Sequence, residues 1–186
     1  MDRNPKPLLL IRADADTRIG AGHVMRALAV AQAWQDRGGI VRMLFAQPNP
    51  AMASRLRGEG VEALVLRCER GTPDDAAAVV DEIRRVAPAG VLVDGYDFGT
   101  DYLLRLQGGG RPVVLFDDYV QAPRLPVQAV VNQNLYAWDV DYANAATGSR
   151  LLVGPRYLCL RREFRAAAKR RDRLEGPVKR IVVTLA

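Results

Sequence analysis

Histidine and cysteine are scarce in this chain. Its 186 residues include one histidine, His23, and two cysteines, Cys68 and Cys159, which lie far apart in the sequence. The cysteines have neither the spacing of metal ligands nor that of a redox pair. A zinc site built on a cysteine cluster is therefore excluded.

Long apolar runs and a secretory leader are also missing. No apolar stretch approaches the roughly 20 residues that span a bilayer. Residues Met1–Pro7 lack the apolar core of a signal peptide. We therefore expect a cytoplasmic protein without a membrane partner.

The chain carries a net charge of +6, but its basic residues do not form a nucleic-acid platform. The densest basic run, Arg161–Arg173, lacks the interleaved aromatic residues on which single-stranded nucleic acids stack. We interpret it as a solvated helix face and expect no nucleic-acid partner. A phosphorylated small molecule remains compatible with the charge.

Short apolar runs alternate with helical patterns along most of the chain. The expected strands are Leu8–Arg12, Ile40–Ala46, Ala63–Leu66, Gly90–Val93, Pro112–Phe116 and Ala129–Val131. The expected helices are His23–Arg37, Ala51–Gly58, Asp74–Val86 and Tyr102–Leu106. Several strand patterns are apolar at every position, which is typical of parallel strands buried on both faces. The alternation predicts an α/β fold with a Rossmann-like, doubly wound parallel sheet.

The alternation ends after Asn132. Residues Asn132–Ser149 are polar and aromatic without a clear period, which predicts a long functional or irregular loop. A basic helix is expected over Arg161–Leu174, followed by a Gly-Pro breaker and a strand pattern at Ile181–Ala186. We therefore expect an N-terminal domain at residues 1–175. Residues 176–186 are expected to be a linker and the first strand of a second, nucleotide-binding domain that is missing here.

His23 stands where acid–base chemistry is plausible. It follows a strand and a turn with Gly20 and Gly22, at an expected helix start. The helix dipole disfavours a positive ring there, so we expect a neutral ring that accepts a proton. Arg12, Asp14 and Arg26 flank it and would orient a phosphate leaving group and a water. The alternative is a histidine that only bonds a backbone carbonyl.

Other motifs near His23 are weaker. The turn departs from the dinucleotide fingerprint, because Met25 occupies the third glycine position and no acidic residue closes the second strand. Asp14-Ala15-Asp16 and Asp139-Val140-Asp141 match the D-x-D pattern with which some glycosyltransferases hold a metal. A metal-dependent transferase therefore stays open as an alternative.

Acidic residues follow two of the expected buried strands. These segments are Asp94–Asp97 and Asp117–Tyr119. Ligands of open α/β sheets bind at the carboxyl ends of strands, so both segments should lie at the same rim as His23. Each carboxylate could instead cap the helix that follows.

Together these segments resemble the nucleotide-sugar hydrolase family of pseudaminic acid biosynthesis and related proteins of spore-coat polysaccharide synthesis. Residues Arg12–Arg26 match its signature R-[SA]-D-[SA]-x-x-x-I-G-x-G-H-x-x-R at every defined position. Further matching segments follow in the same order: Val93–Tyr96 (D-[HG]-Y), Leu115–Asp118 (a double aspartate), Asn132–Tyr136 (N-x-N-x-Y) and Gly154–Phe164 (G-x-x-Y-x-x-[LI]-R-x-E-F). One departure is Gly95, where the hydrolase branch commonly has histidine.

The resemblance implies the N-terminal half of a GT-B-like fold and the inverting hydrolysis of a UDP-linked diacetamido-trideoxy sugar, with release of UDP. His23 would be the catalytic base and Tyr96 would lie near the sugar. No metal and no cofactor are expected. The expected substrate-binding residues are Arg12, Asp14, Gly20, Gly22, Arg26, Tyr96, Asp117 and Asn132.

Two other functions stay open at this point. The first is glycosyl transfer on the same fold, with a sugar hydroxyl in place of water. The second is a non-catalytic half of a split nucleotide-sugar enzyme. In each case the missing domain would be supplied in cis or by a partner chain.

Overall fold

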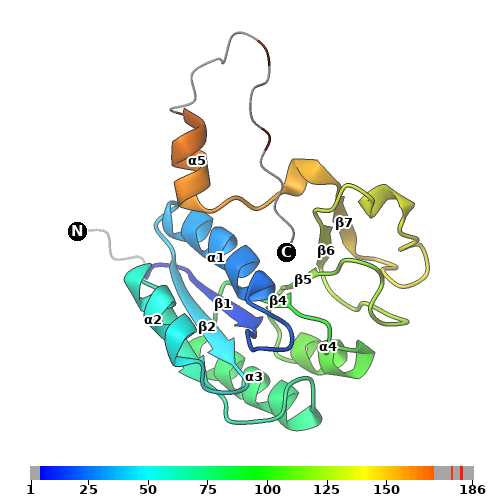
Figure 1. Cartoon of the computed structure of the whole chain (residues 1–186). Helices are drawn as coiled ribbons and strands as arrows, with labels where there is room; N and C mark the ends of the chain where they lie inside the picture. Colours follow the sequence, from blue (N-terminus) through cyan, green and yellow to red (C-terminus); the bar gives the residue numbers. More distant parts are fainter. Residues whose placement is uncertain (1–4, 170–176, 178–180, 182–186) are drawn as a thin grey trace.

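The computed structural model describes residues 5–169, 177 and 181. Seven parallel strands form one sheet in the order β3-β2-β1-β4-β5-β6-β7 (Figure 1). The strands are β1 (Leu8–Ala13), β2 (Ile40–Phe45), β3 (Glu62–Val65), β4 (Gly90–Asp94), β5 (Val113–Phe116), β6 (Ala129–Asn132) and β7 (Arg150–Val153). The helices are α1 (Gly22–Gln35), α2 (Pro50–Gly58), α3 (Pro73–Val86), α4 (Thr100–Gln107) and α5 (Arg162–Lys169), with short 3-10 helices η1 (Ala137–Asp139) and η2 (Pro155–Tyr157).

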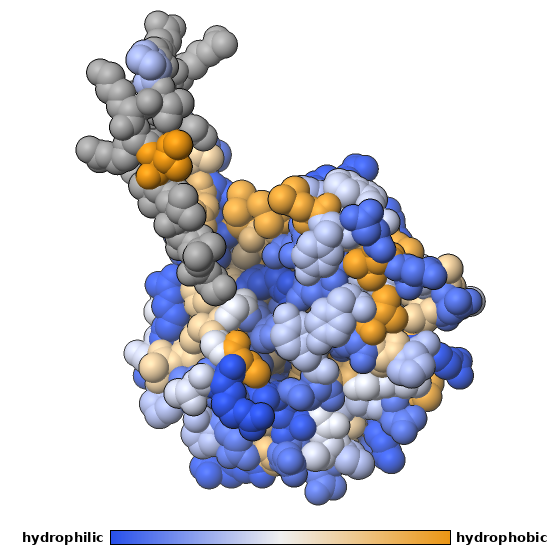
Figure 2. All heavy atoms as spheres, turned by 45° about the vertical axis from the view of Figure 1, so that its right-hand side comes forward, coloured by the Kyte–Doolittle hydropathy of each residue, from blue (hydrophilic) through white to orange (hydrophobic). Residues whose placement is uncertain are grey.

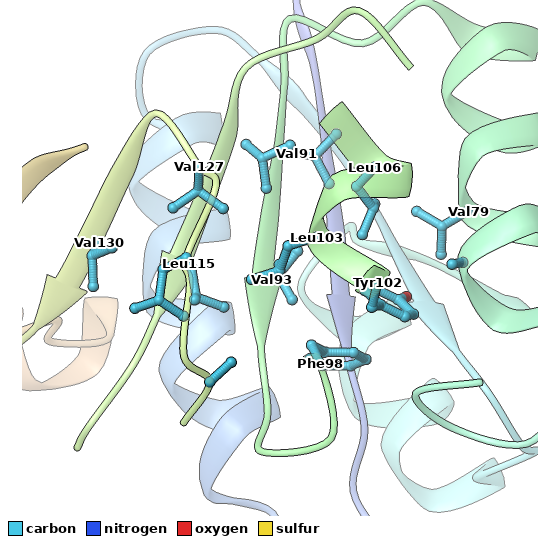
Figure 3. Close-up of a cluster of buried hydrophobic side chains, with 14 of the residues drawn as sticks. Val79, Val91, Val93, Phe98, Tyr102, Leu103, Leu106, Leu115, Val127 and Val130 are labelled. Carbon is cyan, nitrogen blue, oxygen red and sulfur yellow. The ribbon is translucent and has the colours of Figure 1, made fainter. Parts of the chain in front are cut away.

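Helices cover both faces of the sheet because successive strand residues point to opposite sides. Leu9 and Ile11 of β1 pack with α1 and α2, whereas Leu10 between them packs with α3 and α4. Figure 3 shows the second layer, where side chains of β4, β5 and β6 meet those of α3 and α4. The apolar strand patterns thus reflect burial on both faces, as expected of a doubly wound sheet.

The strand order reverses between β1 and β4. The chain runs outward from β1 to β2 and β3, then returns to place β4 on the other side of β1. Ala13 and Asp94, the last residues of β1 and β4, are partners in the register of this pair. In open α/β sheets such a switch point is where the loops diverge and leave room for a ligand.

The six expected strands and four expected helices before residue 132 are confirmed, with ends that differ by at most two residues. β7 was not predicted, and it lies at the edge of the sheet, parallel to β6. The stretch 132–149 holds no strand beyond Asn132 and only η1, as expected of an irregular segment.

The expected C-terminal elements are described in part. The basic helix appears as α5, and the rest of the expected range, residues 170–174, lies outside the described residues. The strand expected at 181–186 also lies outside them, apart from Ile181. Over the described ranges we find no helix with the length and apolar character needed to cross a bilayer.

Candidate functional site

His23 lies in the first turn of α1, directly after the β1–α1 loop. Gly20 has a φ of 69°, which glycine adopts without strain, and its backbone N–H donates to the Asp16 carbonyl at 2.9 Å. The Asp16 carboxylate accepts from the backbone N–H groups of Arg18 and Ile19 at 2.7 and 2.9 Å. The bond from Ile19, followed by those from Arg70 and Arg18, lowers the pKa of Asp16 to about 2. The loop that precedes His23 is therefore held in shape by hydrogen bonds to its own backbone.

Asp94 fixes the His23 ring. The Nδ1 atom of His23 lies 2.8 Å from Oδ1 of Asp94, which is fully buried at the end of β4. Because a carboxylate oxygen faces Nδ1, the neutral ring would carry its proton on Nδ1 and its lone pair on Nε2. No hydrogen bond from the described residues engages Nε2. The imidazole is thus oriented through Nδ1 and leaves Nε2 without a protein partner in the part of the chain that the structure describes, although its side chain is only 7% exposed.

Arg26, one turn further along α1, joins two carboxylates. It donates to both oxygens of Asp94, through Nε at 2.8 Å and Nη2 at 2.6 Å, and through Nη1 to Asp118 at 2.9 Å. Burial alone would lower the pKa of Arg26, but its bonds to Asp94 and Asp118 outweigh burial and raise it. Likewise, burial would raise the pKa of Asp118, but Arg26 keeps it below its ordinary value. Arg26 and Asp118 therefore stabilise the charged form of each other.

Tyr96 forms an aromatic wall beside His23. The ring centroids lie 4.6 Å apart at 83°, an edge-to-face contact, and Tyr119 lies 5.4 Å from Tyr96 on its other side. The Tyr96 hydroxyl donates to Asp118 at 3.1 Å. Burial, together with the Asp118 charge, raises the pKa of Tyr96 to about 12. Tyr96 is still 46% exposed, so its neutral ring presents an apolar surface beside the His23 ring.

Gly95, between Asp94 and Tyr96, has a backbone conformation that favours glycine. Its φ is 154°, and a Cβ added there would lie 2.8 Å from Cε2 of Phe98. Glycine is therefore required at this turn. A histidine at this position, as in the resembling family, would need a different backbone conformation.

Arg12 and Asp14 are both buried and bind groups of the protein, and their expected contact with substrate stays a prediction. Arg12 is fully buried and forms a forked pair with Asp75, with bonds of 2.9 and 2.8 Å. One Asp14 oxygen accepts from the backbone N–H of Ala46 at 2.8 Å, and the other lies 2.6 Å from Arg12 Nη1 without hydrogen-bond geometry. These side chains lie below the rim and brace β1 against the β2–α2 and α3 segments.

Asp117 and Asn132 are likewise fully buried. The Asp117 carboxylate accepts from the three consecutive backbone N–H groups of residues 119–121 and from the Tyr142 hydroxyl. Asn132 donates to the Asp118 carbonyl at 3.0 Å and accepts from the Asn134 backbone at 3.1 Å. Both side chains therefore hold the loops at the rim, and their expected contact with substrate stays a prediction.

Two further carboxylates of the D-x-D segments, those of Asp16 and Asp141, also bind groups of the protein. Asp16 pairs with Arg70 at 2.9 Å in addition to its loop bonds. Asp141 caps the backbone N–H of Ala143 at 2.9 Å. Within the described ranges, no three His, Cys, Asp or Glu side chains gather as a metal site would require.

Of the predicted site residues, the structure brings His23, Arg26 and Tyr96 together, next to the turn made by Gly20 and Gly22. Sequence reasoning missed the roles of Asp94, Asp118 and Asn134, whose Nδ2 donates to Asp118 at 2.8 Å. The available signal was the position of both aspartates at the ends of adjacent strands.

A surface hollow of about 690 Å³ lies elsewhere, near the start of β6. It is lined by Leu104, Gln107, Arg124, Leu125, Pro126, Val127, Gln128, Asn144, Ala145, Thr147 and Gly148, and it contains none of the predicted site residues. The lining has no acid–base group, so we place the site at the switch point instead. Figure 2 shows that the face carrying β6 and β7 is mostly hydrophilic, with hydrophobic side chains in small separate groups.

Comparisons with known proteins give the fold. No family model and no curated protein matches the chain. MurG of Acinetobacter baumannii is similar over 81% of this chain and 46% of its own, at 18% identity and a TM-score of 0.55. A glycosyltransferase from Rickettsia africae ESF-5 is similar over 77% of this chain and 42% of its own, at 12% identity and a TM-score of 0.54. The chain thus spans less than half the length of these structures, and its fold is Rossmann-like, as in about half of a GT-B architecture.

Proposed function

We propose that this chain supplies the catalytic base of an enzyme that acts at the anomeric carbon of a nucleotide sugar. The observation that carries the proposal is the free Nε2 of His23, whose ring is held by Asp94 at the switch point of a GT-B-like half. Displacement at an anomeric carbon with inversion needs a base on the face opposite the leaving group. A positioned base contributes about 10²–10⁴ in rate.

Two acceptors for the sugar are compatible with this base. The first candidate is the hydroxyl of an acceptor molecule, which makes the enzyme a glycosyltransferase. It is favoured by the fold that the chain shares with a glycosyltransferase. The second candidate is water, which makes the enzyme a hydrolase of a UDP-linked diacetamido-trideoxy sugar. It is favoured by the order of motifs from Arg12–Arg26 to Gly154–Phe164.

The test uses this chain assembled with a nucleotide-binding half, either in cis or as a partner chain. The assembled protein is incubated with a UDP-sugar, with and without an acceptor molecule. Release of UDP and free sugar without acceptor supports hydrolysis, and release only with an acceptor supports transfer. His23→Asn should fold as the parent does and lose about 10²–10⁴ in kcat. Near-parental turnover of the folded variant would remove His23 from the mechanism.

A further inference from the structure

Arg26 was expected to meet a phosphate, but its guanidinium is already engaged. Its side chain is 13% exposed and makes four bonds, two to Asp94 and two to Asp118, the last from Nη2 at 3.4 Å. Its planar group also lies over the Phe116 ring, with the central carbon 4.6 Å from the ring centroid. A phosphate would have to displace two carboxylates to reach this cation.

The bonds to Asp94 have a direct consequence for His23. Oδ1 of Asp94 accepts from both His23 Nδ1 and Arg26 Nη2, and Oδ2 accepts from Arg26 Nε. The fork therefore fixes the carboxylate plane that fixes the imidazole. It also supplies the positive charge that two buried carboxylates need beside the ring.

Asp118 extends the same network to the rim. It binds Arg26 on one side, and the Tyr96 hydroxyl and the Asn134 amide on the other, at 3.1 and 2.8 Å. The groups that orient His23 are thereby hydrogen-bonded to Tyr96 and to the loop after β6.

We propose that Arg26 is a positioning residue: by bridging Asp94 to Asp118 it sets the orientation and tautomer of His23, and it does not bind the nucleotide phosphate. The proposal rests on the proposed function only for its kinetic consequence. Its structural consequence concerns the free chain.

Lysine is not expected to replace Arg26. An ammonium is a point charge without the planar fork that holds both oxygens of one carboxylate while reaching a second. A phosphate-binding role would tolerate lysine better, because a point charge suffices there. Arg26→Lys therefore separates the two roles, and it keeps the charge that the buried carboxylates require for folding.

The first measurement needs no substrate. His23 is the only histidine, so the imidazole ¹⁵N NMR signals of the chain belong to one ring. The parent should show the Nδ1–H tautomer alone, as the Asp94 contact requires. Arg26→Lys and Arg26→Gln should shift these signals away from that tautomer, whereas Arg57→Gln, an exposed arginine on α2, should leave them unchanged. Parental signals in a folded Arg26→Lys variant would overturn the proposal.

The second measurement separates kcat from KM in the assembled enzyme. Positioning predicts that Arg26→Lys loses about 10–100-fold in kcat, with KM for the UDP-sugar within about twofold of the parent. A rise in KM with kcat preserved would assign Arg26 to the phosphate and overturn the proposal. An assembled parent without activity would count against the proposed function alone, since the NMR result stands without it.

Discussion

At the scale of single residues, Asp94 decides which nitrogen of His23 is free. In Asp94→Asn, Arg26 Nε would keep its bond to the amide oxygen at the Oδ2 position, while Arg26 Nη2 would lose its acceptor at the Oδ1 position. The amide NH₂ would then face Nδ1 and force the proton onto Nε2. We expect the ¹⁵N spectrum to show the Nε2–H tautomer and kcat of the assembled enzyme to fall about 10²–10⁴-fold, since the wrong nitrogen faces the substrate.

One result would contradict this role of Asp94. A folded Asp94→Asn protein with the parental tautomer would mean that Asp94 does not orient the ring. Glu62→Gln is a suitable control, because its carboxylate lies on β3 at the far edge of the sheet and is half-exposed. It should leave both the tautomer and kcat unchanged.

Replacing Gly95 should lower the stability of the protein. Gly95→Ala forces a side chain into a backbone with φ of 154° and places Cβ 2.8 Å from the Phe98 ring. We expect a loss of about 1–3 kcal/mol in the free energy of unfolding, measured by urea denaturation. Gly58→Ala in α2 meets no atom within 4 Å and should be neutral or slightly stabilising. Equal stability of the two variants would show that the turn at Gly95 is not constrained.

The residue scale also shows what sequence reasoning cannot supply. The types and order of residues were enough to single out His23, Arg26 and Tyr96. They could not distinguish a charged side chain at the rim from one beneath it, because that depends on packing. Arg12 and Asp117 belong to the same motifs as His23 and Asp118, yet they are fully buried and serve neighbouring loops, whereas His23 and Asp118 are 6% and 7% exposed.

At the scale of elements, periodicity predicted the buried strands and failed at the edge. β1, β4 and β5 are apolar runs because both of their faces are covered. Among the described residues β7 pairs with β6 alone, its four residues are exposed or half-exposed, and its sequence carries no strong strand pattern. Only its pairing with β6 makes it a strand, and that is tertiary information.

α5 is also held by tertiary contacts, and this gives a testable consequence. Gln32, which is 1% exposed on α1, accepts from the backbone N–H of Arg162 at 2.6 Å and donates to Glu59 at 3.0 Å. Gln32→Ala should cost about 1–2 kcal/mol and loosen α5 before the sheet. Amide hydrogen exchange should rise about tenfold over 162–169 and stay parental in β1 and β4.

A control on the other face tests that reading. Gln107→Ala removes an exposed amide at the end of α4 and should leave α5 exchange unchanged. If exchange rises equally in α5 and the sheet for Gln32→Ala, then α5 does not open as a separate unit.

At the scale of the whole molecule, charge is distributed unevenly. The chain carries a net charge of +6, yet the arginines around the switch point are bound by carboxylates. Arg12 pairs with Asp14 and Asp75, Arg26 with Asp94 and Asp118, and Arg70 with Asp16 and Asp97. Arg18, the one arginine of the β1–α1 loop, has no carboxylate partner among the described residues. A diphosphate at the switch point itself would therefore meet little free positive charge.

This charge pattern predicts that the nucleotide is bound mainly by groups from outside this chain, in a second domain or a partner. Calorimetric titration of the chain alone with UDP should give no binding tighter than about 1 mM, a free energy near −4 kcal/mol. The assembled two-domain protein should bind UDP in the micromolar range or tighter.

Arg18→Gln should leave the affinity of the assembled protein for UDP within about threefold of the parent, because a single exposed cation contributes little. Sub-millimolar binding by the chain alone would show that this rim holds the nucleotide itself, and a division of labour between base-supplying and nucleotide-binding halves would then no longer describe the protein.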